Sequence, residues 1–175
     1  MLKVQSLANS TQIGRLRYGD RYLARADAVE FDPYRLPLNK SVHEFTRLGG
    51  IPGALRDASP DAWGRRVIER KLECAAGDLH EIDYLRHGPQ DGAGYLSFGP
   101  NVEPLAPKRP HNRTHQLGEL IAAARAIDAG KPVPMLLLEQ LDPGTRLGGA
   151  RPKATIEAPA MLPRCFFLDV PALVF

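Results

Sequence analysis

The chain has 175 residues, of which 43% are hydrophobic and 25% are charged, proportions ordinary for a soluble globular protein with one compact domain or two small ones. Lysines and arginines number 23 against 20 aspartates and glutamates, and this formal charge of +3 is weak support for nucleic-acid binding. No segment approaches the roughly 18 apolar residues of a membrane span and no signal-peptide pattern is present, so we expect a cytoplasmic protein.

Cysteine and histidine spacing predicts no metal site. Cys74 and Cys165 lie far apart and show neither CxxC nor Cys/His spacing, so we expect buried thiols in a reducing compartment rather than zinc ligands or a disulfide framework. The five histidines include no H-E-x-x-H pair.

The N-terminal segment, residues 1–38, is typical of strands and turns. Leu16 and Tyr18 alternate with arginines, which predicts a strand with one buried and one exposed face. A tight turn at Gly19-Asp20 makes the segment 21–23 the simplest candidate for its pairing partner. The glycine-rich stretch 39–56 predicts a loop.

The first helix has three start signals in a row. Ser59 is a suitable N-cap, Pro60 suits the first helical position, and Asp61 suits the first turn. Trp63 leads an apolar stripe at helical spacing, and Gly77 is the predicted end. We therefore expect Trp63 to anchor a hydrophobic core.

Further helices are predicted in the second half of the chain. A short helix follows Asp78, and a proline-rich stretch over 101–112 predicts a stiff linker. The most regular apolar periodicity runs from Leu117 and ends before Gly130. Pro134 starts another short helix.

A glycine-rich segment, residues 142–153, comes directly afterwards. Its three glycines allow close approach of the backbone to an anion, and the ammonium group of Lys153 would neutralise that anion. The spacing is not that of a Walker A loop, because Lys153 does not directly follow a glycine. An ordinary hairpin turn with a surface lysine, whose second arm holds Thr155 and Ile156, is the alternative.

Three short stretches carry a family resemblance: Arg56-Asp-Ala-Ser-Pro-Asp-Ala-Trp-Gly-Arg65, Asp83-Tyr-Leu85 followed by Gly92-Ala-Gly94, and Gly148-Gly-Ala-Arg-Pro-Lys-Ala154. In this order and spacing they resemble the HipA family of serine/threonine kinase toxins. The first and last stretches are the specific ones. The resemblance covers roughly residues 5–157.

The resemblance implies an α+β fold. It would comprise a small, mainly antiparallel β N-terminal subdomain with helices over residues 1–100, the linker over 101–112, and the start of a kinase-like N-lobe over 113–157, which holds helices and the glycine-rich loop. Residues 158–175 would be a divergent apolar tail.

The resemblance also implies a function within a toxin-antitoxin system. Such kinases use ATP and Mg²⁺ to phosphorylate translation proteins, aminoacyl-tRNA synthetases among them. The loop residues Gly148, Gly149, Ala150 and Lys153 would contact the nucleotide phosphates. The expected partner is an Xre-type helix-turn-helix antitoxin or a separate kinase chain.

Two departures from the family pattern limit this expectation. Many members have an autophosphorylated serine in the loop, where this chain has Arg146; the adjacent Thr145 is the candidate phosphorylation site. Phosphoryl transfer also needs a catalytic aspartate and carboxylate or amide ligands for Mg²⁺, which in this family lie beyond the loop. After Lys153 only Glu157 and Asp169 are carboxylates, so we expect no catalytic residue, no metal ligand and only weak nucleotide binding.

The tail admits two interpretations. The first is a frameshifted or truncated gene, because the tail lacks the family pattern. Where a nucleotide-contacting lysine would stand, the tail has Phe166-Phe167-Leu168 and no lysine. The alternative is an apolar strand that closes the sheet.

The leading expectation is therefore the N-terminal portion of a HipA-like kinase, truncated and not catalytic on its own. The alternative is a stand-alone, non-catalytic module that binds and regulates a separate HipA-like kinase chain. A weaker third possibility is nucleic-acid binding through Arg65, Arg66 and Arg70. Because glutamates interrupt that helix face, we favour an ordinary solvated surface and expect no direct nucleic-acid contact.

Overall fold

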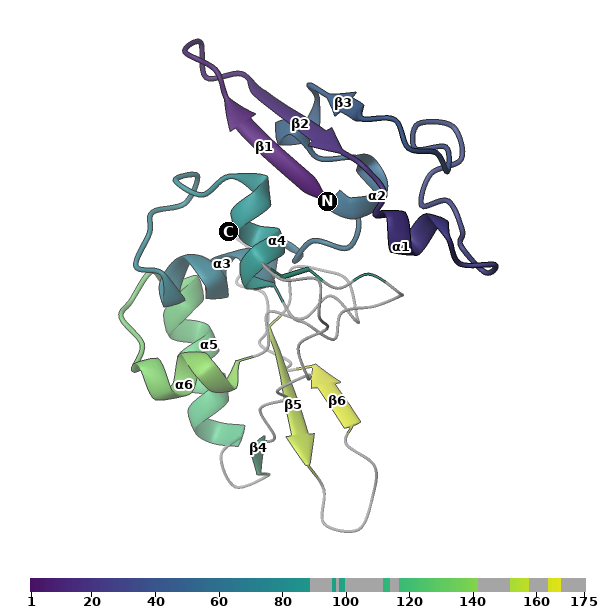
Figure 1. Ribbon diagram of the computed structural model, residues 1–175. Helices are drawn as coiled ribbons and strands as arrows, with labels where there is room; N and C mark the ends of the chain where they lie inside the picture. Colours follow the sequence, from purple (N-terminus) through teal and green to yellow (C-terminus); the bar gives the residue numbers. More distant parts are fainter. Residues whose placement is uncertain are drawn as a thin grey trace. The chain divides into compact units, whose positions relative to one another are not determined.

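The computed structural model describes residues 1–88, 96, 98–99, 112–113, 117–141, 152–157 and 164–167. These residues form a mixed α+β structure, as predicted. The chain divides into two compact units (Figure 1). The first unit comprises residues 1–59 and 80–85, and the second unit comprises residues 60–79 and 86–175.

Six strands and six α-helices occur in the described part of the chain. The strands are β1 (Leu2–Ser6), β2 (Gln12–Leu16), β3 (His43–Phe45), β4 (Asn112–Arg113), β5 (Lys153–Glu157) and β6 (Arg164–Phe167). The helices are α1 (Asp20–Leu23), α2 (Gly53–Arg56), α3 (Ala62–Lys71), α4 (Glu81–His87), α5 (Leu117–Asp128) and α6 (Met135–Gln140), with a 3₁₀ turn, η1 (Leu48–Gly50).

The first unit contains an antiparallel sheet in the order β1-β2-β3. Gly14 of the central strand lies opposite Val4 on one side and Phe45 on the other. Leu16 and Tyr18 are buried, and the arginine before each of them is exposed. The predicted alternation is therefore confirmed: successive side chains point alternately to the core and to solvent.

The pairing partner predicted for β2 is wrong. Residues 21–23 belong to α1, a single helical turn in which the amide of Leu23 donates to the carbonyl of Gly19 at 3.0 Å. The partners of β2 are instead β1 and β3. The prediction of a loop over 39–56 is also incomplete, because β3, η1 and α2 lie within that stretch.

The main chains of β2 and η1 approach so closely that no side chain fits between them. A Cβ atom on Gly14 would lie 1.6 Å from the carbonyl oxygen of Gly50. Gly50 also has a φ of 73°, which a residue with a side chain rarely adopts. Both positions therefore require glycine.

Tyr18 holds the segment after α1 in place. Its hydroxyl donates a hydrogen bond to the carbonyl of Leu36 at 2.9 Å and accepts one from the amide of Phe31 at 3.2 Å. The Tyr18 ring also lies 5.8 Å from that of Tyr22 and 5.3 Å from that of Phe31, between centroids. Burial is the main cause that raises the pKa of the Tyr18 hydroxyl above its ordinary value.

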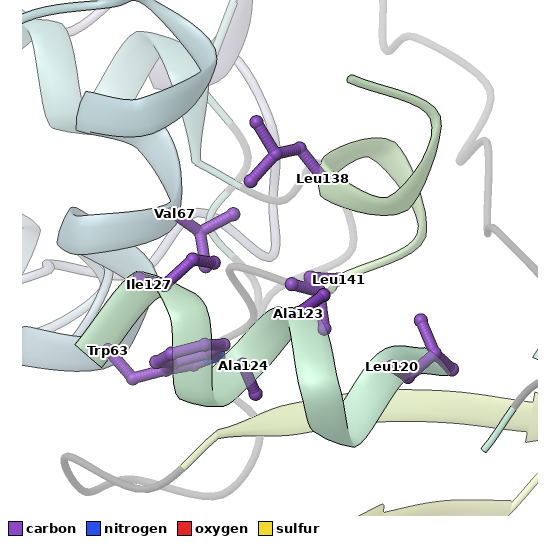
Figure 2. Close-up of a cluster of buried hydrophobic side chains, with 8 residues drawn as sticks. All are labelled: Trp63, Val67, Leu120, Ala123, Ala124, Ile127, Leu138 and Leu141. Atoms are coloured by element: carbon purple, nitrogen blue, oxygen red, sulfur yellow. The ribbon is translucent and has the colours of Figure 1, made fainter. Parts of the chain in front are cut away.

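The core of the second unit lies between α3, α5 and α6. Figure 2 shows its side chains, which come from these three helices and from the residue directly after α6. They are Trp63, Val67, Leu120, Ala123, Ala124, Ile127, Leu138 and Leu141. The helices predicted from Leu117 and from Pro134 are confirmed, as is the place of Trp63 in a core.

A second sheet, in the order β4-β5-β6, also belongs to this unit. β4 is parallel to β5, and β6 is antiparallel to β5, with Ala154 opposite Phe166. The prediction that Thr155 and Ile156 form a strand is confirmed, but β6, which follows β5, is its antiparallel partner. Residues 164–167 of the tail thus form a strand, the second of the two interpretations.

Replacing Trp63 by alanine should destabilise the protein by about 3–5 kcal/mol, because the side chain is fully buried and would leave a cavity among the three helices. Chemical denaturation with the helical circular dichroism signal measures this loss. Leu136→Ala on α6 is the control, since Leu136 is 68% exposed and its loss should cost below about 0.5 kcal/mol. Equal stability of the two variants would contradict the assignment of Trp63 to the core.

The raised pKa of Tyr18 predicts a loss of stability in alkali. A group whose pKa is higher in the folded state stabilises that state below its unfolded pKa, near 10 for tyrosine, and loses this contribution as pH rises beyond it. The difference in unfolding free energy between wild type and Tyr18→Phe should therefore shrink above about pH 10. Tyr34→Phe, at a side chain 97% exposed, should show no such trend in urea titrations at pH 8 and 10.5.

Candidate functional site

The stretch from Arg56 to Arg65 leads into α3. The carboxylate of Asp61 accepts a hydrogen bond from the amide of Gly64 at 2.9 Å, so Asp61 is the N-cap. The expected cap, Ser59, lies before the helix and is buried. Pro60 precedes the cap and so does not occupy the predicted first helical position.

The C-terminal end of α3 also differs from the prediction. The helix ends at Lys71 and not at Gly77. Glu73 has a φ of 53°, which breaks the helical path before any glycine is reached.

The arginines of α3 make contacts inside the second unit. The Nε atom of Arg65 donates to the carbonyl of Pro60 at 3.2 Å. The guanidinium group of Arg66 lies 3.3 Å from the Asp128 carboxylate and 5.8 Å from the centroid of the Trp63 ring. The Arg66–Asp128 contact joins α3 to α5, and the Arg65–Pro60 contact fixes the residues before α3. Both favour a packing role for these two arginines over a nucleic-acid contact.

Most residues of the predicted phosphate loop lie outside the described part of the chain. Thr145, Gly148, Gly149 and Ala150 are among them. Lys153 is described by its main chain as the first residue of β5, opposite Phe167 of β6. Lys153 is therefore a strand residue, and its distances to the other predicted loop residues lie outside the described part of the chain.

A small hollow in the first unit was not predicted from the sequence. Its volume is about 170 Å³, and its lining includes Arg35, Glu44, Arg47, Leu48, Ile51 and Pro52. Ile51 and Pro52 are buried, whereas the two arginines are exposed. No sequence motif joins these residues, because Arg35 precedes β3 and the others follow along β3, η1 and the start of α2.

The described residues contain no group of three or more histidine, cysteine, aspartate or glutamate side chains that could hold a metal ion. Within the same ranges, no helix has both the length and the apolar character needed to cross a membrane. No protein-family model, curated protein or solved structure matches the chain.

Removal of the α3 cap should weaken the second unit. Asp61→Ala leaves the amide of Gly64 without its acceptor and should lower the free energy of unfolding by about 1 kcal/mol. Asp61→Asn keeps an acceptor of similar shape and should cost less, so denaturation of both variants separates capping from general effects of the substitution. Wild-type stability of Asp61→Ala would show that the cap contributes nothing.

Proposed function

We propose that residues 1–175 act as the N-terminal portion of a HipA-like serine/threonine kinase toxin, in a cytoplasmic toxin-antitoxin module. In this proposal the chain supplies the N-terminal subdomain and the start of a kinase-like N-lobe, including the loop over the nucleotide phosphates. It does not carry out phosphoryl transfer by itself. Its partner is an Xre-type helix-turn-helix antitoxin.

The observation that carries this proposal is the position of Lys153 at the first residue of β5, directly after the glycine-rich segment. A rigid strand is a suitable base for a loop that must hold its backbone amides against phosphates. The hairpin of β5 and β6 provides that base. The chemistry of Gly148, Gly149, Ala150 and Lys153 is then charge neutralisation and close backbone approach to an anion.

The family-like stretch around α3 supports the same proposal in a different way. Asp61 caps the helix and Trp63 fills the core, so two residues of the motif have structural roles that explain why they occur together. Arg66, directly after the motif, lies beside the Trp63 ring. The stretch thus fits a scaffold element, which agrees with a non-catalytic N-terminal region.

Phosphoryl transfer needs more than a phosphate loop. A carboxylate must position the attacking hydroxyl, and further carboxylate or amide oxygens must hold Mg²⁺ against the phosphates. Beyond Lys153, residues 154–175 contain only Glu157 and Asp169 as carboxylates. We therefore assign nucleotide contact, and not catalysis, to these 175 residues.

A second candidate function is a stand-alone module that binds and regulates a separate HipA-like kinase chain. The observation that favours it is β6. The apolar residues Phe166 and Phe167 belong to a strand paired with β5. The residues that follow the glycine-rich segment therefore form a hairpin within this chain, as a stand-alone module would require. Gene neighbourhood separates the two candidates, because a reading frame that restores the kinase lobe supports the first and a complete kinase gene beside this one supports the second.

Residues 1–175 should not transfer phosphate. Incubation with Mg²⁺ and γ-labelled ATP should leave both the chain, Thr145 included, and a translation extract unlabelled, because the carboxylates that phosphoryl transfer requires are missing from these residues. Labelling that disappears in Lys153→Ala would contradict the proposal.

ATP should bind weakly, with a dissociation constant of roughly 1 mM, or about 4 kcal/mol, since only phosphate contacts are available. Lys153→Ala should weaken this binding further in an NMR titration, whereas Lys131→Ala, at an exposed lysine after α5, should not. Equal affinities of wild type and Lys153→Ala for ATP would show that Lys153 does not contact the phosphates. Micromolar affinity would show that the chain holds a complete nucleotide pocket.

A further inference from the structure

The hollow beside β3 and η1 combines an apolar floor with a positively charged rim. Ile51 and Pro52 are buried in its lining. Arg35 and Arg47 also line it, both are exposed, and no ion pair involves either guanidinium group among the residues that the structure describes. The one acidic lining residue, Glu44, already pairs with Arg15 at 2.8 Å, so the rim carries uncompensated positive charge.

Leu48 occupies a strained position at this hollow. Its φ is 55°, a value that is a genuine outlier for a bulky side chain. Its side chain is nevertheless 44% exposed and is not buried in the core. The positive φ belongs to the turn that brings Gly50 against Gly14, but a leucine is not the residue that such a turn favours. Backbone outliers of this kind concentrate at binding sites.

The hollow also borders the edge of a sheet. β3 pairs with β2 on one side only within the described ranges, and Glu44 and Phe45 of this strand contribute to the lining. An edge strand presents unpaired amide and carbonyl groups that can pair with an added strand. Pockets beside such an edge receive alternate side chains of the added segment.

The size of the hollow limits its ligand. Its volume of about 170 Å³ corresponds to roughly six water molecules at about 30 Å³ each, which is enough for one large apolar side chain. It is well below the roughly 300–1,000 Å³ of pockets that enclose drug-sized ligands, so a nucleotide is a poor fit.

We propose that this hollow binds an extended, acidic peptide segment of a partner protein. The main chain of the peptide pairs with the free edge of β3. One apolar side chain of the peptide packs against Leu48, Ile51 and Pro52. The carboxylate two residues further along the peptide, on the same face of the added strand, lies between Arg35 and Arg47. None of its residues belongs to the predicted phosphate loop, and the proposal does not depend on the kinase proposal.

A fluorescein-labelled peptide, Thr-Glu-Thr-Leu-Thr-Glu-Thr with capped ends, is the probe, because its leucine and both glutamates fall on one face of an extended strand. We expect the full chain to bind it with a dissociation constant of about 0.1 mM in fluorescence anisotropy, and to bind the analogue with glutamine in place of glutamate at least about tenfold more weakly. Backbone amide shifts in NMR spectra should be confined to Arg35 and its neighbours and to residues 43–53. Equal binding of the two peptides would overturn the proposal.

Charge variants test the role of the rim. Arg35→Glu and Arg47→Glu should each weaken binding of the acidic peptide about fivefold or more, and the double variant should prefer an analogue with lysine in place of glutamate. Arg21→Glu is the matched control, because Arg21 is an exposed arginine of α1 outside the hollow. A comparable loss in Arg21→Glu would indicate attraction to the general positive charge of the chain and would overturn the site.

Leu48→Gly separates binding from stability. Glycine relieves the backbone strain at this position, so the thermal midpoint should stay unchanged or rise, while the affinity for the acidic peptide should fall at least about fivefold. Wild-type affinity in Leu48→Gly would remove Leu48 from the binding surface. A lowered midpoint would show a folding role for this side chain and would contradict the argument from strain.

Discussion

The contact between the main chains of Gly14 and Gly50 is the constraint on which the first unit depends. It brings η1 against the central strand at a distance that excludes any side chain at either position. To reach this contact the chain turns through three consecutive residues with positive φ, Leu48, Gly49 and Gly50. The same turn fixes where Arg47 and Ile51 emerge on either side of it. The small hollow is thus a by-product of a close backbone approach in the sheet.

Local patterns in the sequence predicted the elements that local interactions specify. The alternation at Leu16 and Tyr18 marked β2, and the apolar periodicity after Leu117 marked α5, because each pattern repeats over several residues. The α3 start was predicted to within a few residues, but two residues separated by Pro60, Ser59 and Asp61, both suit an N-cap. Which of them caps the helix is decided by backbone conformation and not by composition.

Non-local pairing explains what the sequence did not predict. β3 spans only His43–Phe45 and shows no usable alternation, so its pairing with β2 depends on the turn that follows it. The hairpin expected at β5 placed its antiparallel partner before it in the sequence, whereas β6 comes after it. The sequence pattern of a single strand does not distinguish these two cases. The rim arginines, Arg35 and Arg47, come from separate segments that carry no shared motif. The phosphate-loop prediction rests on spacing and family resemblance, and only Lys153 among its residues has a described position.

The parallel pairing of β4 with β5 has a consequence for the order in which the second unit folds. Asn112 lies opposite Ile156, and both α5 and α6 lie between them in the chain. Such a connection loses much loop entropy on closure, whereas the β5–β6 hairpin closes locally and can form in roughly 1–10 μs. Packing of α3, α5 and α6 around Trp63 would shorten this connection, so we expect that packing to precede the pairing of the two strands. We therefore expect the rate at which this sheet is completed to follow the rate of helix packing, and not the rate of hairpin formation.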